Sequence, residues 1–165
     1  MTENSTPIVE FRNVDFAIAG AKILDSIDLQ IFKGETFVLL GESGCGKTTT
    51  LKLINRLIEP TGGSVLVEGK STLEWDAIRL RRRIGYVLQE GGLFPHFTIA
   101  RNISLIPELE NWEPAKARAR VFELLELVGL NPQKFAGRFP HELSGGQRQR
   151  VGVARALAAN PELLL

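Results

Sequence analysis

Apolar and polar residues follow one another in patterns that predict strands at the front of the chain. From Val9 to Val14 they alternate, which is typical of a strand with one face in water. A second strand is expected around Ile27 to Phe32, with a turn at Lys33-Gly34 after it. The apolar, partly β-branched run from Thr36 to Leu40 indicates a strand buried on both faces. The front of the chain is therefore expected to be rich in β structure.

A helix and another strand are expected next. The segment from Thr49 to Leu57 places Leu53, Leu57 and Ile58 on one apolar side, as an amphipathic helix does. Consecutive glycines then break this pattern, and Ser64 to Glu68 is again typical of a strand. The chain thus alternates between the two kinds of element.

Helical spacing dominates after a last short, buried strand, which we expect from Ile84 to Leu88. Pro114 suits the first turn of a helix, and Gly129 suits its C-terminal end. Another short helical turn is expected at Asn131-Pro132. The apolar positions of the longer helix are Val121, Phe122, Leu125 and Val128. The pattern therefore predicts an α/β core with a helical insertion.

A complete phosphate-binding pattern, G-x-x-x-x-G-K-[ST], runs from Gly41 to Thr48 between an expected strand and an expected helix. Its glycines allow the backbone to wrap closely around phosphate oxygens, and N–H groups at the helix start face the anion. Lys47 is expected to reach the β- and γ-phosphates, and the Thr48 hydroxyl to ligate Mg²⁺. The alternative, a glycine-rich turn with an incidental lysine, would not require this setting. The candidate nucleotide-binding residues of the loop are Gly41, Glu42, Ser43, Gly44, Cys45, Gly46, Lys47, Thr48 and Thr49.

Size and composition restrict the class of protein. A chain of 165 residues, 44% hydrophobic and 24% charged, is long enough for one core. Its net charge of +1 provides no general attraction to nucleic acid or to anionic membranes. We interpret the one basic cluster, at Arg79, Arg81, Arg82 and Arg83, as a solvated helix face rather than a nucleic-acid patch. No apolar stretch approaches membrane-spanning length, and residues 1–7 lack the apolar core of a signal peptide.

The only cysteine, Cys45, lies inside the phosphate loop. A single cysteine excludes an internal disulfide and fits a reducing cytosol. Cys45 occupies an x position of the motif, where many residue types are accepted, which indicates a small filler rather than a catalyst. We therefore expect alkylation of Cys45 to block nucleotide by bulk.

A second motif, Leu143 to Gln147, opens another helical segment. Ser144 and Gln147 fit S-x-x-Q, the capping box of a helix start. Capping alone does not account for Gly145 and Gly146, since glycine is a poor residue in a first helical turn unless the backbone must approach something closely. The motif is therefore interpreted as a cap that also builds a second anion site.

With these motifs in this order, the chain resembles the ATP-binding subunit of an ABC transporter over essentially its whole length. Gly41 to Thr48 matches the family's Walker A loop, Gln89 its Q-loop glutamine, and Leu143 to Gln147 its signature. The resemblance implies a P-loop NTPase (RecA-like) α/β core with an N-terminal antiparallel β subdomain and an inserted helical subdomain.

The resemblance also implies boundaries for these parts. Residues 1–90 would form the β-rich front and the phosphate-loop core, and residues 91–142 the helical subdomain. Residues 143–165 would form the signature helix and the start of the Walker B strand. The family continues beyond such a start into an Asp-Glu pair and later a switch histidine, which His96 and His141 do not replace. We therefore expect the 165-residue chain to be incomplete at its C-terminus, impaired in hydrolysis and poorly soluble by itself.

A head-to-tail dimer that binds and hydrolyses ATP is the function that the resemblance implies. ATP would lie between Walker A of one subunit and the signature of a second one. Lys47 and Gln89 would be the catalytic residues, and Thr48 and Gln89 would lie on the Mg²⁺ side. The signature residues that would contact ATP are Ser144, Gly145, Gly146 and Gln147. The family's adenine-stacking aromatic is replaced by Ile18, with Phe16 nearby as a possible substitute.

The segment Leu93 to Thr98 follows Gln89 where the family docks its membrane permease subunits. The alternative is a loop with Leu93 and Phe94 tucked into the core. The stretches Ile84 to Trp112 and Val151 to Leu157 resemble importers of quaternary amines such as glycine betaine, choline and proline. The resemblance thus implies a cytoplasmic subunit on the inner face of the membrane, held there by permease subunits and served indirectly by a substrate-binding protein.

Other functions stay open at this point. Lipid or amino-acid importers share the motifs, and a non-hydrolysing nucleotide-binding module would fit a chain without the Asp-Glu pair. A soluble ABC-type ATPase acting on DNA or translation is a further alternative. It is disfavoured by the short interval between Gln89 and Leu143 and by the near-neutral charge, and no nucleic-acid partner is expected.

Overall fold

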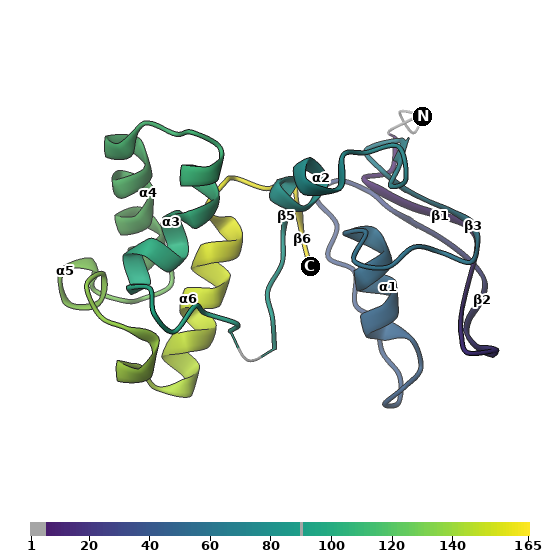
Figure 1. Ribbon diagram of the computed structural model, residues 1–165, viewed down its shortest axis with the longest axis horizontal. Helices are drawn as coiled ribbons and strands as arrows, with labels where there is room; N and C mark the ends of the chain where they lie inside the picture. The colour runs from purple at the N-terminus through teal and green to yellow at the C-terminus, as the bar shows by residue number, and fades with distance from the viewer. Residues whose placement is uncertain (1–5, 90) are drawn as a thin grey trace. The chain divides into compact units, whose positions relative to one another are not determined.

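The computed structural model describes residues 6–89 and 91–165 (Figure 1). Within these ranges the chain forms two compact units, one reaching Arg81 and the other running from Arg82 to Leu165. The first unit is built on an antiparallel sheet and the second mainly on helices. The expectation of an α/β protein with a β-rich front is therefore confirmed.

Within residues 6–81, the sheet of the first unit has four strands: β1 (Val9–Ile18), β2 (Ala21–Ile31), β3 (Gly62–Val67) and β4 (Lys70–Ser71). They are antiparallel and lie in the order β2-β1-β3-β4. The two strands expected at the front are both present and longer than predicted. They extend because Ala19 and Gly20, with positive φ angles of 50° and 82°, join β1 directly to β2 in a tight hairpin.

In β1, Val9 and Phe11 are buried in alternation, and so are Val14 and Phe16. The alternation shifts by one residue between Phe11 and Val14, where the pairing with β2 is irregular. Helix α1 (Lys47–Ile54) packs on β3 and buries Leu53 and Ile54. The helix ends before Leu57 because Arg56 leaves the helical region, with a positive φ of 50°. Leu57 is consequently 49% exposed, so the prediction that it lies on the apolar face is wrong.

The strand predicted from Thr36 to Leu40 is absent from the described residues. The backbone there is irregular, and none of the strand pairings between described residues includes it. Phe37, Val38 and Leu40 are 48%, 64% and 88% exposed. A strand of a parallel sheet exists only with neighbours that take up its N–H and C=O groups. An apolar run identifies a candidate strand but not its partners, and this prediction is wrong for the structure.

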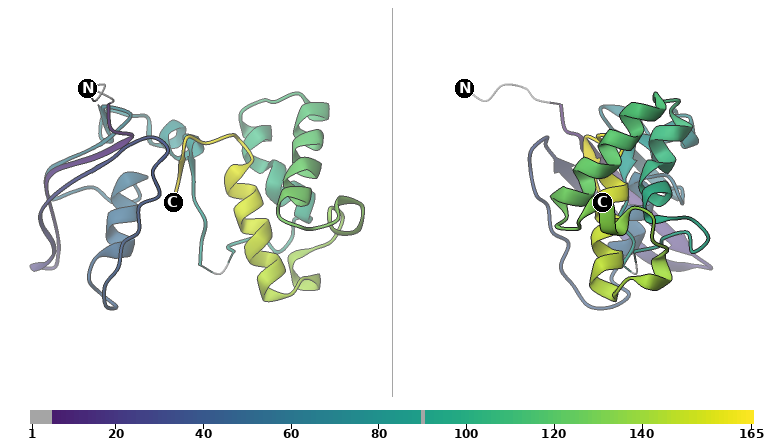
Figure 2. Two further views of the ribbon diagram at one scale, coloured as in Figure 1. Left: turned by 180° about the vertical axis from the view of Figure 1, so that it is seen from behind. Right: turned by 90° about the vertical axis from the view of Figure 1, so that its left-hand side faces the viewer.

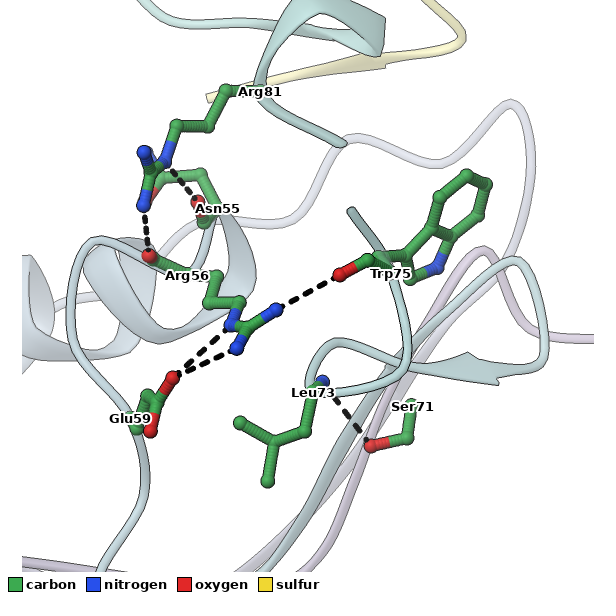
Figure 3. Close-up of polar contacts among 7 residues, drawn as sticks. All are labelled: Asn55, Arg56, Glu59, Ser71, Leu73, Trp75 and Arg81. Atoms are coloured by element: carbon green, nitrogen blue, oxygen red, sulfur yellow. Dashed lines mark hydrogen bonds and ion pairs between the residues drawn. The ribbon is translucent and has the colours of Figure 1, made fainter. Parts of the chain in front are cut away.

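Helix α2 (Ala77–Arg83) carries the basic cluster, and Figure 3 shows how one of its arginines is used. Arg81 donates to the carbonyl oxygens of Asn55 at 3.3 Å and Arg56 at 2.6 Å, just beyond the last turn of α1. A cation in this place satisfies carbonyl groups that the helix leaves without partners and suits the helix dipole. Arg82 likewise bonds within the second unit. The cluster is therefore more than a solvated helix face.

Among the described residues of the second unit beyond α2, five segments are helical: α3 (Ile99–Leu109), α4 (Pro114–Leu127), α5 (Pro132–Phe135), the 3-10 turn η1 (Pro140–Glu142) and α6 (Gly145–Leu157). Helices α3, α4 and α6 pack together around a shared apolar core (Figure 1). The predicted helix ends are confirmed. Pro114 opens α4, Gly129 follows its end with a φ of 70°, and Asn131 caps α5.

A small parallel ladder completes this unit. It joins β5 (Ile84–Gly85) to β6 (Leu163–Leu164), and the Val87 N–H still donates to the Leu165 carbonyl at 2.8 Å. The strand expected from Ile84 to Leu88 is thus present but shorter, because the ladder ends there and Leu88 is 43% exposed. Among the helices of the described residues, none has the length and apolar character to cross a membrane.

Candidate functional site

The phosphate loop ends at Gly46, whose φ of 93° lies in the left-handed region, and α1 begins at the next residue. No side chain of the described residues caps this helix start. Its first-turn N–H groups therefore have no acceptor within the helix, and they coincide with the positive end of the helix dipole. Gly44 also takes a positive φ, 88°, which a larger residue would adopt only with strain. This arrangement fits an anion.

The Lys47 side chain folds back over the loop. Its Nζ donates to the carbonyl oxygens of Gly41 at 2.8 Å and Glu42 at 2.6 Å, and lies 3.4 Å from the Cys45 thiol. The Cys45 Sγ is 2.6 Å from the position that a Cβ on residue 41 would occupy, so the thiol packs on the Gly41 backbone. The Lys47 ammonium group and the uncapped start of α1 therefore lie together at the phosphate loop.

Two residues of β2 hold the loop on the sheet. A Cβ on Gly46 would lie 2.7 Å from Leu24 Cδ2 and 3.3 Å from the Ile23 carbonyl oxygen, so only glycine allows this approach. Thr50 is buried, and its hydroxyl donates to the Gly46 carbonyl at 3.0 Å. Sequence reasoning missed Thr50, although threonine often bonds back to the carbonyl four residues earlier.

The other candidate residues of this unit differ in exposure. Thr48 is exposed and Thr49 is half-buried in the first turn of α1. Ile18 is 60% exposed at the end of β1, whereas Phe16 is only 6% exposed inside the core. Phe16 would have to leave the core to reach a ligand. Of the two candidates for adenine contact, Ile18 is thus the accessible one.

The second motif forms the predicted capping box at the start of α6. The Ser144 N–H donates to the Gln147 side chain at 2.9 Å, and the Gln147 N–H donates to the Ser144 hydroxyl at 3.3 Å. Gly145 and Gly146 are exposed, and a Cβ on either would approach no described atom closer than 3.9 Å. Packing within the described part of the chain therefore does not require these glycines, although glycine is a poorer helix former than alanine.

Gln89 is exposed beyond the end of β5. Its backbone carbonyl accepts a hydrogen bond from the Gln149 side chain of α6 at 3.3 Å. Thr48 belongs to the first unit and Gln89 to the second, so a shared Mg²⁺ site stays a prediction. No group of three or more His, Cys, Asp or Glu side chains within residues 6–89 and 91–165 is arranged to hold a metal ion. A single Thr48 hydroxyl still fits Mg²⁺, which completes its shell with water and substrate phosphates.

The segment Leu93 to Thr98 is organised by Asn102, a fully buried residue of α3. The Asn102 Oδ1 accepts the Phe94 N–H at 2.8 Å. Its Nδ2 lies 3.1 Å from the carbonyl oxygens of Phe94 and Phe97, and 3.0 Å from that of Thr98. One side chain therefore fixes the backbone along the segment. Sequence reasoning missed Asn102, whose signal is a polar residue within an apolar helix face.

The side chains of this segment point in different directions. Leu93 packs against the core of the second unit, whereas Phe94 is 40% exposed. The alternative of a tucked-in loop is therefore right for Leu93 and wrong for Phe94. His96 is exposed with its ring centroid 4.4 Å from that of Phe97, and His141 is exposed in the second unit. The segment presents an aromatic surface on a fixed backbone.

The fold and the phosphate loop define a P-loop nucleotide-binding protein. More particularly, residues 24–165 match the ABC transporter family, and the chain belongs to it.

Two curated relatives show which branch of the family is similar. The chain is 56% identical to the glycine betaine/carnitine/choline transport ATP-binding protein OpuCA of Bacillus subtilis, over 88% of this chain and 38% of that protein. It is 53% identical to the osmoprotectant import ATP-binding protein OsmV of Salmonella typhimurium, over 87% of this chain and 38% of that protein. The chain therefore spans well under half the length of these relatives.

A solved structure shares the fold. The chain aligns with the dimeric ATP-binding cassette MJ0796, described as a post-hydrolysis state bound to ADP and Pi, with a TM-score of 0.83 and 35% identity. The alignment covers 94% of this chain and 72% of that one. The expected P-loop NTPase fold is thereby confirmed.

Proposed function

We propose that this chain is the nucleotide-binding part of a subunit that energises an ABC importer, binding ATP and, in the complete subunit, hydrolysing it. The Gly41–Thr48 loop carries this proposal, because it ends in an uncapped helix start and folds around the Lys47 ammonium group. Backbone N–H donors and a cation in one turn suit a triphosphate. The names of the relatives, transport ATP-binding proteins, support it.

ATP is proposed to bind between two copies, with the phosphate loop of one facing the signature of the other. Gly145 and Gly146 support this arrangement, since they leave the start of α6 open while nothing within the described chain requires glycine there. An exposed helix start without side chains lets its N–H groups approach phosphate closely. The similar MJ0796 cassette is dimeric with bound ADP and Pi, which supports a dimer here.

Within such a site the residues take different roles. Lys47 would exchange its contacts with the loop carbonyls for the β- and γ-phosphates, and Ile18 would lie against adenine. Gln89 would orient the attacking water, and Thr48 would hold Mg²⁺. When bound, Mg²⁺ neutralises charge on the phosphates. The reaction would be accelerated by positioning and electrostatic stabilisation rather than by covalent chemistry.

Membrane subunits are proposed to dock near Leu93–Thr98. Phe94, Pro95 and His96 are exposed there, on a backbone that Asn102 fixes. An aromatic surface held in one conformation binds a partner with little loss of conformational freedom. The resulting complex would lie at the inner face of the cytoplasmic membrane. The relatives' names favour an osmoprotectant of the quaternary-amine class as its solute.

Nucleotide binding tests the proposal most directly. In the complete subunit, Lys47→Ala should weaken binding of a fluorescent ATP analogue about 10- to 100-fold, the effect of losing one charge-assisted contact. Lys52→Ala is the matched control, because Lys52 is an exposed lysine in the last turn of the same helix. Equal affinities of wild type and Lys47→Ala would contradict the proposal. Binding without ATP turnover by the assembled complex would favour a non-hydrolysing module instead.

A further inference from the structure

Helix α6 holds the backbone segment around and after Gln89. Arg155 donates to two carbonyl oxygens of this segment, Gly92 at 2.7 Å and Gly91 at 3.1 Å. Six residues earlier, less than two turns along the helix, the Gln149 side chain donates to the Gln89 carbonyl at 3.3 Å. The left view of Figure 2 shows the chain after β5 running down on the side of α6. Two side chains of one helix thus hold three carbonyl groups of one segment.

The segment also lies unusually close to the helix. A Cβ on Gly152 would be 3.2 Å from the Cα and from the oxygen of Gly91, and a Cβ on Gly91 would be 3.0 Å from the Arg148 oxygen. Backbone therefore packs directly on backbone. Burial lowers the pKa of the Arg155 guanidinium, which nevertheless stays charged at neutral pH. Carbonyl dipoles of the segment compensate that charge, so loop and helix depend on each other.

The same helix carries the signature motif at its other end. Ser144 and Arg155 are eleven residues apart along α6, which is about 16 Å in a continuous helix. A straight helix transmits a displacement of one end to the other, because its hydrogen bonds keep it rigid. A contact at Ser144 is therefore mechanically connected to the segment that Arg155 holds.

We propose that Arg155, assisted by Gln149, is a positioning residue that ties the backbone following Gln89 to the signature helix. When a nucleotide contacts Ser144–Gln147 at the start of α6, the orientation of Gln89 then changes with it. This inference rests on the proposed function, in which Gln89 orients water. Arginine suits the role because its planar fork reaches two successive carbonyl groups, whereas the lysine ammonium is a compact point charge.

The test is a double-mutant cycle on the complete subunit assembled with its membrane subunits. Arg155→Lys keeps the charge and removes the fork. It should lower kcat for ATP hydrolysis about 10-fold or more and change KM by less than about 3-fold, since misplacement acts on the chemical step. In a Gln89→Ala background, where there is no side chain left to orient, Arg155→Lys should change kcat by less than about 2-fold.

Arg150→Lys is the matched control. Arg150 lies on the same helix and also donates to two successive carbonyl oxygens, Val128 at 3.2 Å and Gly129 at 3.4 Å, on a different segment. The Arg150→Lys substitution should leave kcat for ATP hydrolysis within about 2-fold of wild type. If Arg155→Lys does not fold by thermal melting, Gln149→Ala takes its place in the cycle, because Gln149 is exposed and uncharged.

The outcomes separate this inference from the proposed function. Unchanged kcat in Arg155→Lys, or equal losses with and without Gln89, would show a merely structural arginine and overturn the inference alone. A wild-type complex without ATP turnover would overturn the proposed hydrolysis and the inference with it. Loss of kcat that disappears in the Gln89→Ala background supports the coupling.

Discussion

At the scale of single residues, Cys45 reports directly on where nucleotide binds. Its thiol is exposed, packs on Gly41 and lies 3.4 Å from the Lys47 Nζ. An alkyl group on Sγ would fill the space beside Lys47 that we assign to phosphate oxygens. Alkylation of Cys45 should therefore abolish ATP binding in isothermal titration, and bound ATP should slow the alkylation.

The control for this experiment is Cys45→Ser, which keeps a small side chain in the loop. It should bind ATP as the unmodified protein does and be insensitive to the reagent. Because Cys45 is the one cysteine of these 165 residues, mass spectrometry of the peptide that contains it measures its modification directly. Unchanged ATP affinity after complete modification would place the nucleotide elsewhere.

At the scale of elements, the loop before α3 depends on one buried side chain. Asn102 is fully buried and contacts one N–H and three carbonyl groups of Leu93–Thr98. Asn102→Leu would remove the partner of the Phe94 N–H and of the Phe97 carbonyl, whereas the carbonyls of Phe94 and Thr98 keep backbone donors. The free energy of unfolding should therefore fall by about 2 kcal/mol. The Phe94 N–H should exchange with solvent faster. Denaturant unfolding and NMR-detected hydrogen exchange measure the two effects.

Asn131→Ala is the comparison for Asn102→Leu. The Asn131 side chain accepts the Lys134 N–H, at 3.0 Å, as the cap of α5. Its loss should cost about 1 kcal/mol and leave Phe94 exchange unchanged. If Phe94–Thr98 is the docking surface for membrane subunits, Asn102→Leu should also weaken assembly of the complex more than Asn131→Ala does. Equal assembly of the two variants would contradict the docking site.

The distance along the chain between a residue and the backbone that it contacts explains which features the sequence could predict. Pro114, Gly129 and the Ser144 capping box were predictable because each acts on backbone within a few residues of itself. Arg155 was not, because the carbonyl groups that it binds carry no sequence signal and lie 63 and 64 residues away. Asn102 stands out as a polar residue within an apolar helix face, but this signal does not identify the groups that it binds. The prediction of a strand from Thr36 to Leu40 failed for a related reason, since a strand is defined by partners outside it.

The phosphate loop was the most predictable part of the site. Its motif specifies backbone shape through glycine, and the structure has the expected positive φ at Gly44 and Gly46. The exposure of Ile18 and the burial of Phe16 needed the structure, because both follow from the strand's register in the sheet.

At the scale of the whole molecule, the proposed site is divided between two copies. In each copy, the loop around Lys47 would then contact one nucleotide, and the open start of α6 at Gly146 would contact the other. Two defective variants should therefore complement each other. Lys47→Ala removes the cation, and Gly146→Asp places a carboxylate where phosphate would approach the helix start, which repels it.

Each variant alone would form dimers with two defective sites. A dimer containing one copy of each has one site with both defects and one site with none. An equal mixture of the two complete subunits should therefore show ATP-dependent dimers by light scattering that neither variant shows alone. A site contained within one chain predicts no such recovery, because every copy in the mixture would still carry a defect. Recovery in the mixture, together with its absence in each variant alone, thus distinguishes a site shared between copies from one within a single copy.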